Sequence, residues 1–302
     1  MLKVSGKLDC QSFLDIAKQY RSQCLQTNSH NQIIIDLTQM TFADPFGIMG
    51  LTLLVRSVRL DTNTKCRVLL PSDSAAKSYL VKSGCLVFCS KHIECERSYL
   101  GTFDRVFGNL LKRNFIPLTP ISSENDIGPI NNQVESFLIE NNYHYSKEEI
   151  NDIQVMISEL CQNVIYHSES AIPERGLFFM QGYKPKMSGK GKFCMVSIGD
   201  AGIGIRNSLN KNPRLENMVF SDCKAISLAL KEGVSGVDGD RFRGNGLYDL
   251  NRLTKKHKAN LYIHSHGGVV SYTFKESGRI KEENDIFPVI GTQVCFSLEE
   301  KR

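Results

Sequence analysis

The spacing of hydrophobic residues in the first third of the chain changes repeatedly between a strand-like and a helix-like pattern. Short apolar runs bounded by polar residues predict strands, and apolar residues at helical spacing predict the helices between them. In chain order these elements are a strand at 2–8, a helix at 11–25, a buried strand at 32–37, an apolar helix ending at Arg59, a strand at 66–70 and a helix at 74–83. This order predicts an α/β sheet.

After the first third of the chain, the hydrophobic pattern is at first less regular and then predicts a second set of helices and strands. Residues 115–121 form an apolar strand candidate, and a short amphipathic helix is expected around 129–141. A long helix is expected to begin at Ser146, whose hydroxyl can cap it while Glu149 reaches back in the S-x-x-E arrangement. Its expected buried stripe consists of Ile153, Met156, Ile157, Leu160 and Val164. Later elements are a strand at 193–198, a helix at 248–258 and a strand at 293–298.

Length and composition favour an ordinary globular protein with more than one domain. The chain has 302 residues, of which 41% are hydrophobic, and this exceeds what one core usually organises. We predict domains at 1–96 and 146–302, separated by a structured connector at 97–145. The net charge of +5 comes without a long run of like charges, which argues against nucleic-acid binding. The longest apolar run, 45–55, is too short to cross a bilayer, and a cytoplasmic location is expected.

The ten cysteines are spread over predicted strands and helices, which is typical of reduced thiols in a core. One group, Cys85, Cys89, His92 and Cys95, offers four candidate zinc ligands. Their spacing lacks the paired CxxC hairpins of common structural zinc sites, so we favour buried core cysteines over a metal site. Zinc stays open as the alternative.

Three polar residues recur every fourth position in the long helix: Glu159, Asn163 and His167. Their side chains therefore share one face of the helix, beside the apolar stripe. Alone, such a group is usually a solvated face. Two glycine turns follow it: Asp200-Ala-Gly202-Ile-Gly204 after the strand at 193–198, and Gly244-Asn-Gly246-Leu247 before the helix at 248–258.

In this order, the three segments resemble the ATP-binding boxes of the GHKL superfamily, which includes gyrase, the ninety-kilodalton heat-shock chaperone, histidine kinases and anti-sigma kinases. Gly291-Thr292 at the start of the last strand fits the same pattern. The resemblance covers 146–298. It implies the Bergerat fold, an α/β sandwich in which helices cover one side of a mixed sheet, with ATP and Mg²⁺ as cofactors.

Each segment has a role that the resemblance implies and that its chemistry suits. Asn163 would be the magnesium ligand, since Mg²⁺ needs few protein oxygens beside phosphate. Glu159 would be the catalytic base. Asp200 would accept a hydrogen bond from the adenine amine, close to Gly202, Gly204 and Thr292.

The phosphates would lie against the second glycine turn. Gly244, Gly246 and Leu247 precede or open a helix whose first amides can face phosphate oxygens. The polar, glycine-rich segment 231–243 suits a lid, in which Arg243 is either a phosphate contact or ordinary surface charge. His167 is an accessory contact or only complements the helix dipole.

The first 96 residues resemble a STAS domain, the fold of bacterial anti-sigma-factor antagonists, on the segments 33–51 and 66–88. Such domains often carry a phosphorylatable serine in a D-S-S-G-like turn, but this chain reads Asp44-Pro45-Phe46-Gly47. The resemblance therefore implies a partner-binding module without that phosphorylation switch. A domain that serves only to form a homodimer is the alternative.

Three functions remain open at this point. The first is an ATPase whose hydrolysis switches the interaction with a protein partner. The second is a serine/threonine protein kinase of the anti-sigma type, in which Glu159 activates a substrate hydroxyl. The third is an ATP-gated interaction module without catalysis, against which the presence of Glu159 argues.

Overall fold

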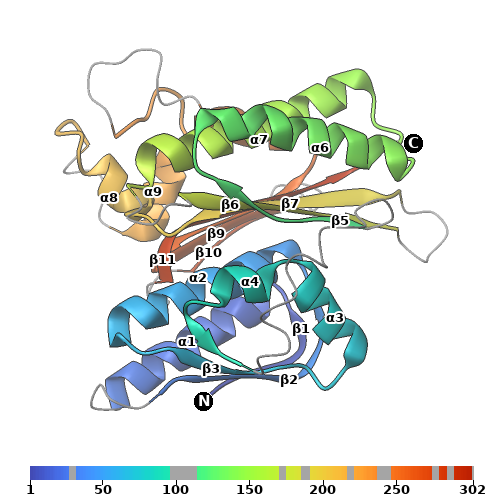
Figure 1. Ribbon diagram of the computed structural model, residues 1–302. Helices are drawn as coiled ribbons and strands as arrows, with labels where there is room; N and C mark the ends of the chain where they lie inside the picture. Colours follow the sequence, from blue (N-terminus) through green and yellow to red (C-terminus); the bar gives the residue numbers. More distant parts are fainter. Residues whose placement is uncertain are drawn as a thin grey trace. The chain divides into compact units, whose positions relative to one another are not determined.

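The computed structural model describes residues 1–26, 32–95, 114–169, 175–184, 191–215, 221–236, 246–273, 279–283 and 289–300. By its internal contacts the chain divides into two units. The first comprises Met1–Arg113 and Ile286–Ile290, and the second comprises Asn114–Asp285 and Gly291–Arg302. Figure 1 shows the helices and strands of both.

The first unit is built on a parallel sheet of four strands in the order β1-β2-β3-β4. The strands are β1 (Leu2–Leu8), β2 (Ile34–Ala43), β3 (Cys66–Leu69) and β4 (Ile93–Glu94). The helices are α1 (Cys10–Gln26), α2 (Pro45–Thr62), α3 (Ser74–Lys82) and α4 (Cys85–Cys89). They lie over one face of the sheet (Figure 1). Strands joined through helices must run parallel when each helix crosses the same face, which explains this sheet.

The turn before α2 has the features that start a helix. Asp44 accepts a hydrogen bond from the Gly47 amide at 2.7 Å, and Pro45 occupies the first helical turn. Gly47 packs so closely that an added β-carbon would lie 2.1 Å from the Leu8 carbonyl oxygen. Phe46 is fully buried, and its ring packs edge-on against Phe13. Phe46, between the capping Asp44 and the closely packed Gly47, is thus a core aromatic residue.

The cysteines are largely core residues, as the sequence indicates. Seven of the ten are buried, Cys85 and Cys89 among them. Across the described residues there is no group of three or more His, Cys, Asp or Glu side chains that could hold a metal ion.

The second unit contains a seven-stranded sheet in the order β10-β9-β8-β11-β7-β6-β5. Its strands are β5 (Phe115–Ile121), β6 (Gly176–Tyr183), β7 (Phe193–Asp200), β8 (Asn260–His266), β9 (Gly268–Thr273), β10 (Arg279–Glu283) and β11 (Val289–Glu299). Its helices are α6 (Ile127–Glu140), α7 (Lys147–His167), α8 (Gly204–Leu209), α9 (Asp222–Ala229) and α10 (Gly246–Lys256), with a 3₁₀ turn at Glu124–Asp126.

The α/β class is confirmed for this unit, and the five strand pairs whose register is defined all run antiparallel. A direct hairpin such as β8–β9 requires this direction, because a short connection can join only antiparallel neighbours. The segment 97–145, predicted to be a structured connector, contains β5 and α6, and both belong to the second unit. There β5 is one of the two edge strands of the sheet.

Helix α7 crosses one face of the sheet beside α6 (Figure 1). The Ser146–Glu149 capping box forms at its start, with hydrogen bonds of 2.9 and 3.2 Å. The predicted apolar stripe from Ile153 to Val164 is buried against the core of the unit. The neighbouring face of α7 is not part of this stripe and can therefore border a cavity.

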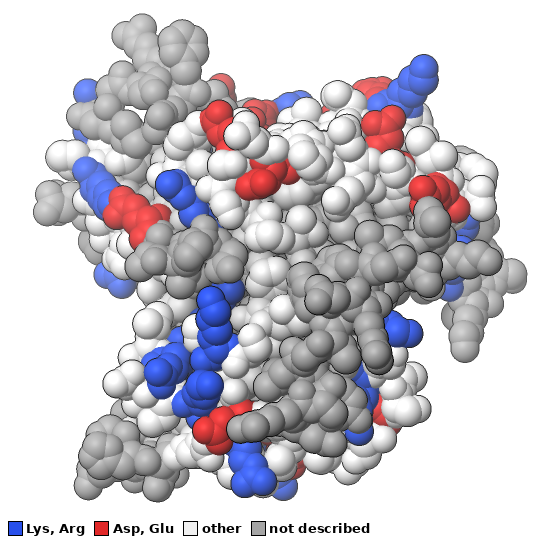
Figure 2. All heavy atoms as spheres, in the orientation of Figure 1, with Lys and Arg blue, Asp and Glu red and all other residues white. Residues whose placement is uncertain are grey.

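The surface of the second unit carries both signs of charge. On the face shown in Figure 2, Asp and Glu side chains lie among Lys and Arg instead of forming a one-sign patch. Within the described residues, no helix combines the length and the apolar character that a membrane crossing requires.

Candidate functional site

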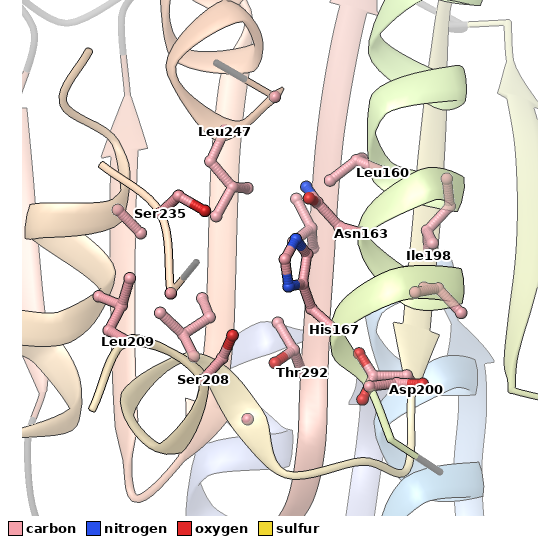
Figure 3. Close-up of a pocket in the computed structure, with 18 of the residues that line it drawn as sticks. Leu160, Asn163, His167, Ile198, Asp200, Ser208, Leu209, Ser235, Leu247 and Thr292 are labelled. Carbon is pink, nitrogen blue, oxygen red and sulfur yellow. The ribbon is translucent and has the colours of Figure 1, made fainter. Parts of the chain in front are cut away.

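A cavity opens within the second unit, and its empty space, counted together with the open solvent at its mouth, is about 800 Å³. Its lining combines apolar side chains with a few polar groups, as is typical of ligand pockets. It is bordered by the second half of α7, the end of β7, the first half of β11, helix α8, the start of α10 and the segment after α9 (Figure 3). The polar or glycine residues of its lining are Asn163, His167, Ser168, Asp200, Gly204, Ser208, Ser235, Gly236, Gly246 and Thr292. The apolar ones are Leu160, Val164, Ile198, Ile205, Leu209, Ala229, Val234, Leu247 and Val294.

Helix α7 supplies two of the predicted residues directly, since Asn163 and His167 both line the cavity. Figure 3 shows them projecting from the helix above Asp200. The Nδ2 atom of Asn163 is buried and has no hydrogen-bond partner among the described residues. A buried amide group without a partner is costly, so this side chain is ready to bind a group that enters the cavity.

Glu159, one turn before Asn163, lies at the edge of the cavity. It is not among the lining residues, but a β-carbon added to Gly246 would come within 2.7 Å of its Oε2 atom. Partial burial and the nearby charge of Asp249 raise the pKa of the Glu159 carboxyl. A carboxylate with a raised pKa is a better proton acceptor at neutral pH than an ordinary glutamate.

Asp200 ends β7 at the opposite end of the cavity, and only 7% of its surface is exposed. Its Oδ1 atom accepts a hydrogen bond from the Gly202 amide at 2.8 Å, and the Thr292 amide also donates to the carboxyl. Burial nevertheless raises the pKa of Asp200 to about 7, because two amides do not replace the water that has been removed. This carboxyl is therefore a buried hydrogen-bonding group that lines the cavity.

Close backbone packing explains the glycines of the turn after Asp200. A β-carbon on Gly202 would lie 1.9 Å from the Ser168 carbonyl oxygen. Gly204 has a φ of 76°, and its added β-carbon would lie 2.1 Å from the His266 ring. Non-glycine residues rarely adopt such a φ. Gly204 is the one of the two that also lines the cavity.

Hydrogen bonds hold this turn from both sides. The Ile203 amide donates to the Ser168 carbonyl at 2.8 Å, which ties the turn to the end of α7. On the β8 side, the Ile205 amide donates to the Ser265 hydroxyl at 2.9 Å, and a ring nitrogen of His266 lies 2.8 Å from the Ile203 carbonyl. The floor of the cavity is thus fixed by elements far apart in sequence.

Thr292 stands next to Asp200 because β11 and β7 are neighbours, with these two residues paired in the register. Gly291, directly before it, has a φ of 79°, and an added β-carbon would lie 1.8 Å from the Asp200 carbonyl oxygen. The Thr292 hydroxyl lies 3.3 Å from the Ser265 hydroxyl and borders the cavity. The Gly291-Thr292 pair thus belongs to the same site as Asp200.

The described residues include only the end of the second glycine turn. Gly246 and Leu247, at the start of α10, line the cavity on the side facing Asn163 (Figure 3). Arg243 and Gly244 lie outside the described residues, as does most of the segment expected to form a lid. No Lys or Arg occurs in the described lining.

Two polar lining residues, Ser168 and Ser208, were not singled out from the sequence, whereas Ser235 and Gly236 belong to the segment 231–243 that was expected to form a lid. Gly236 packs on the Ser208 carbonyl, which would lie 2.2 Å from an added β-carbon, and Asn212 donates a 2.9 Å hydrogen bond to the Ser235 carbonyl. The sequence signal at 233–236 is the Gly-Val-Ser-Gly run, whereas Ser208 in α8 has no recognisable pattern.

Comparison with models of known protein families and with curated proteins finds no match for this chain.

Proposed function

We propose that the second unit is a GHKL-type module that binds Mg-ATP and hydrolyses it to switch the interaction with a protein partner. The observation that carries the proposal is the meeting of Asn163, Asp200 and Gly246 around one cavity, although they come from three separate segments. The antiparallel sheet covered by α6 and α7 is compatible with an α/β sandwich of this type.

The adenine base fits the Asp200 end of the cavity. Asp200 offers a buried acceptor for the exocyclic amine, and Thr292 places a hydroxyl beside it. Guanine would present a carbonyl to the same carboxylate and leave it unpaired, which costs binding free energy. Apolar residues such as Ile198 and Val294 would contact the faces of the base.

The phosphates and the magnesium ion fit the other end of the cavity. The buried Nδ2 atom of Asn163 lacks a partner among the described residues, and a β-carbon added to Gly246 would lie 2.7 Å from Oε2 of Glu159 and 3.3 Å from Nδ2 of Asn163. Asn163 would hold magnesium through its amide oxygen, and the first amides of α10 would donate to phosphate oxygens. Bound magnesium would supply charge neutralisation at the phosphates.

Glu159 is the proposed base. Its carboxyl lies against Gly246, and burial together with Asp249 raises its pKa, so that it can accept a proton from a water that attacks the terminal phosphate. The same proton transfer from a serine or threonine hydroxyl would make the protein a kinase. The partner-binding role falls to the first unit, whose STAS-like character rests on its sequence and on helices over a parallel sheet.

Tracing the terminal phosphate tests this proposal. The chain is incubated with Mg-ATP labelled in the γ-phosphate, with and without candidate partner proteins. Free labelled phosphate supports hydrolysis, protein-bound label supports the kinase, and ATP binding without release of label supports a gated interaction module. Absence of ATP binding by calorimetry refutes the proposal.

A further inference from the structure

A cluster of charged residues lies where α10 ends, away from the cavity. The Lys256 ammonium contacts the Asp152 Oδ2 atom at 2.7 Å and the Glu148 Oε1 atom at 2.7 Å. His257 places its Nε2 atom 2.6 Å from the same Asp152 oxygen. Asp152 and His257 are nearly buried, with side-chain exposures of 11% and 2%, whereas Glu148 is 73% exposed. Asp152 is thus the centre of the cluster.

This cluster and the cavity lie at opposite ends of the helix pair formed by α7 and α10. Near the cavity, Gly246 of α10 meets Glu159 and Asn163 of α7. At the far end, Lys256 of α10 meets Asp152 of α7, so the two helices run antiparallel. Gly246 to Lys256 spans about 15 Å of helix, and Asp152 to Asn163 spans about 16 Å, so both contact points are in register along the pair.

Apolar packing alone does not set this register. The buried residues of α10 are Leu250, Leu253 and Thr254, whose burial resists separation of the helix from the core. Burial of apolar surface is not directional, so it opposes a shift along the axis less than hydrogen bonds of fixed length do. Charge-assisted contacts at 2.6 and 2.7 Å to a nearly buried carboxylate provide that fixed length.

We infer that Asp152, through Lys256 and His257, is a positioning residue that holds the first turn of α10 at the distance from Asn163 required to bind the phosphates of the nucleotide. The inference rests on the proposed function and assigns a role to residues outside the cavity. Along α7, Asp152 is about 24 Å from Ser168, which contacts the turn after Asp200. The cluster acts on the site through α10, whose lining residues are Gly246 and Leu247, so it is expected to affect the phosphate end and to leave the base end unchanged.

Comparison of ATP with adenosine tests the inference, because adenosine has the base without the phosphates. Dissociation constants for both are measured by calorimetry with Mg²⁺ for the wild type, Asp152→Asn and Lys256→Gln. Each substitution is expected to raise the dissociation constant of ATP about tenfold, because the favourable interaction of the phosphates with the start of the helix is lost. The dissociation constant of adenosine should stay unchanged. Lys255→Gln, which removes a charge from the neighbouring exposed position, is the matched control and should change neither.

Other results overturn the inference in distinguishable ways. If Asp152→Asn and Lys256→Gln weaken ATP and adenosine equally, the cluster serves only the stability of the fold. If they change neither constant while the wild type binds ATP, the cluster has no part in binding and the proposed function stands. A wild type that binds neither ligand refutes both. Lys256 is 39% exposed, so Lys256→Gln is expected to fold even if Asp152→Asn is destabilised.

Discussion

Gly246 lies directly against the carboxylate of Glu159: a β-carbon on Gly246 would be 2.7 Å from Oε2 of Glu159 and 3.3 Å from Nδ2 of Asn163. The start of α10 thus lies so close to Glu159 and Asn163 of α7 that a side chain at position 246 would contact both. This approach joins the proposed base, the proposed magnesium ligand and the proposed phosphate contact.

Gly246→Ala should therefore impair turnover more than folding. The added methyl group displaces the flexible end of Glu159, while alanine suits a helix, so the free energy of unfolding should change by less than about 1 kcal/mol. Phosphate release should fall by about tenfold or more, since the base is moved from its position. Steady-state phosphate release and urea unfolding measure the two effects.

The Glu159→Ala background provides the control for Gly246→Ala. Without the Glu159 carboxylate, the closest contact of the new methyl group is removed. Any loss of stability caused by Gly246→Ala should then be smaller, which is the non-additivity expected of residues in contact. An equal loss in both backgrounds would show that the methyl group acts elsewhere.

Substitutions of Asn163 and Glu159 should affect ATP binding and ATP turnover separately. Asn163→Ala is expected to abolish Mg-ATP binding in calorimetry, because it removes the proposed magnesium ligand. Glu159→Ala is expected to retain binding and to lower phosphate release by about a hundredfold or more, the usual contribution of a general base. Unchanged affinity in the first variant, or turnover equal to wild type in the second, would remove the residue from its proposed role.

The sequence could predict most elements because each carries its own local signal. The capping box at Ser146, the apolar stripe of α7 and the strands at both ends of the chain were all recognisable from spacing alone. It could not predict that β5 is an edge strand of the second sheet, since pairing with β6 depends on residues about sixty positions later. Strand direction likewise follows from non-local pairing.

The candidate site shows the same division between local and non-local signals. Seven of the residues singled out from motifs line one cavity: Asn163, His167, Asp200, Gly204, Gly246, Leu247 and Thr292. Ser208 and the Asp152–Lys256–His257 cluster were missed, because a serine in a short helix or a charge pair between two helices has no sequence pattern of its own.

Gly202→Ala should disrupt the fold around the site. Its β-carbon would lie 1.9 Å from the Ser168 carbonyl oxygen, and a backbone atom cannot rotate away as a side chain can. We expect a loss of about 2 kcal/mol or more in the free energy of unfolding, together with loss of ATP binding. Urea unfolding and calorimetry measure these effects. Ala201→Gly, at the neighbouring position of the same turn, adds no atoms and should still bind ATP. If this variant fails to bind, the flexibility of the turn is responsible instead of the steric clash.

Asp200 should make folding stability depend on pH. Its folded pKa of about 7 lies above the ordinary value of 3.8, so the native state holds this proton more tightly than the unfolded chain does. The stabilising contribution is present in full below pH 3.8 and is lost as pH rises to about 7. The difference is on the order of 4 kcal/mol, and Asp200→Asn should remove it. Asp44, with a pKa also raised to about 7, contributes with the same sign, so only the difference between wild type and Asp200→Asn isolates Asp200.

Binding of ATP should depend on pH in the opposite direction. The adenine amine donates a hydrogen bond to Asp200, which favours the ionised carboxylate, so affinity should fall as pH decreases from 8 to 6 through the pKa of about 7. Calorimetry across this range, at constant Mg²⁺ concentration, measures the dependence. Titration of the ATP phosphate would give a similar slope, and adenosine, which lacks phosphate, provides the control. A pH-independent affinity for adenosine would show that the base does not bind at the Asp200 carboxylate.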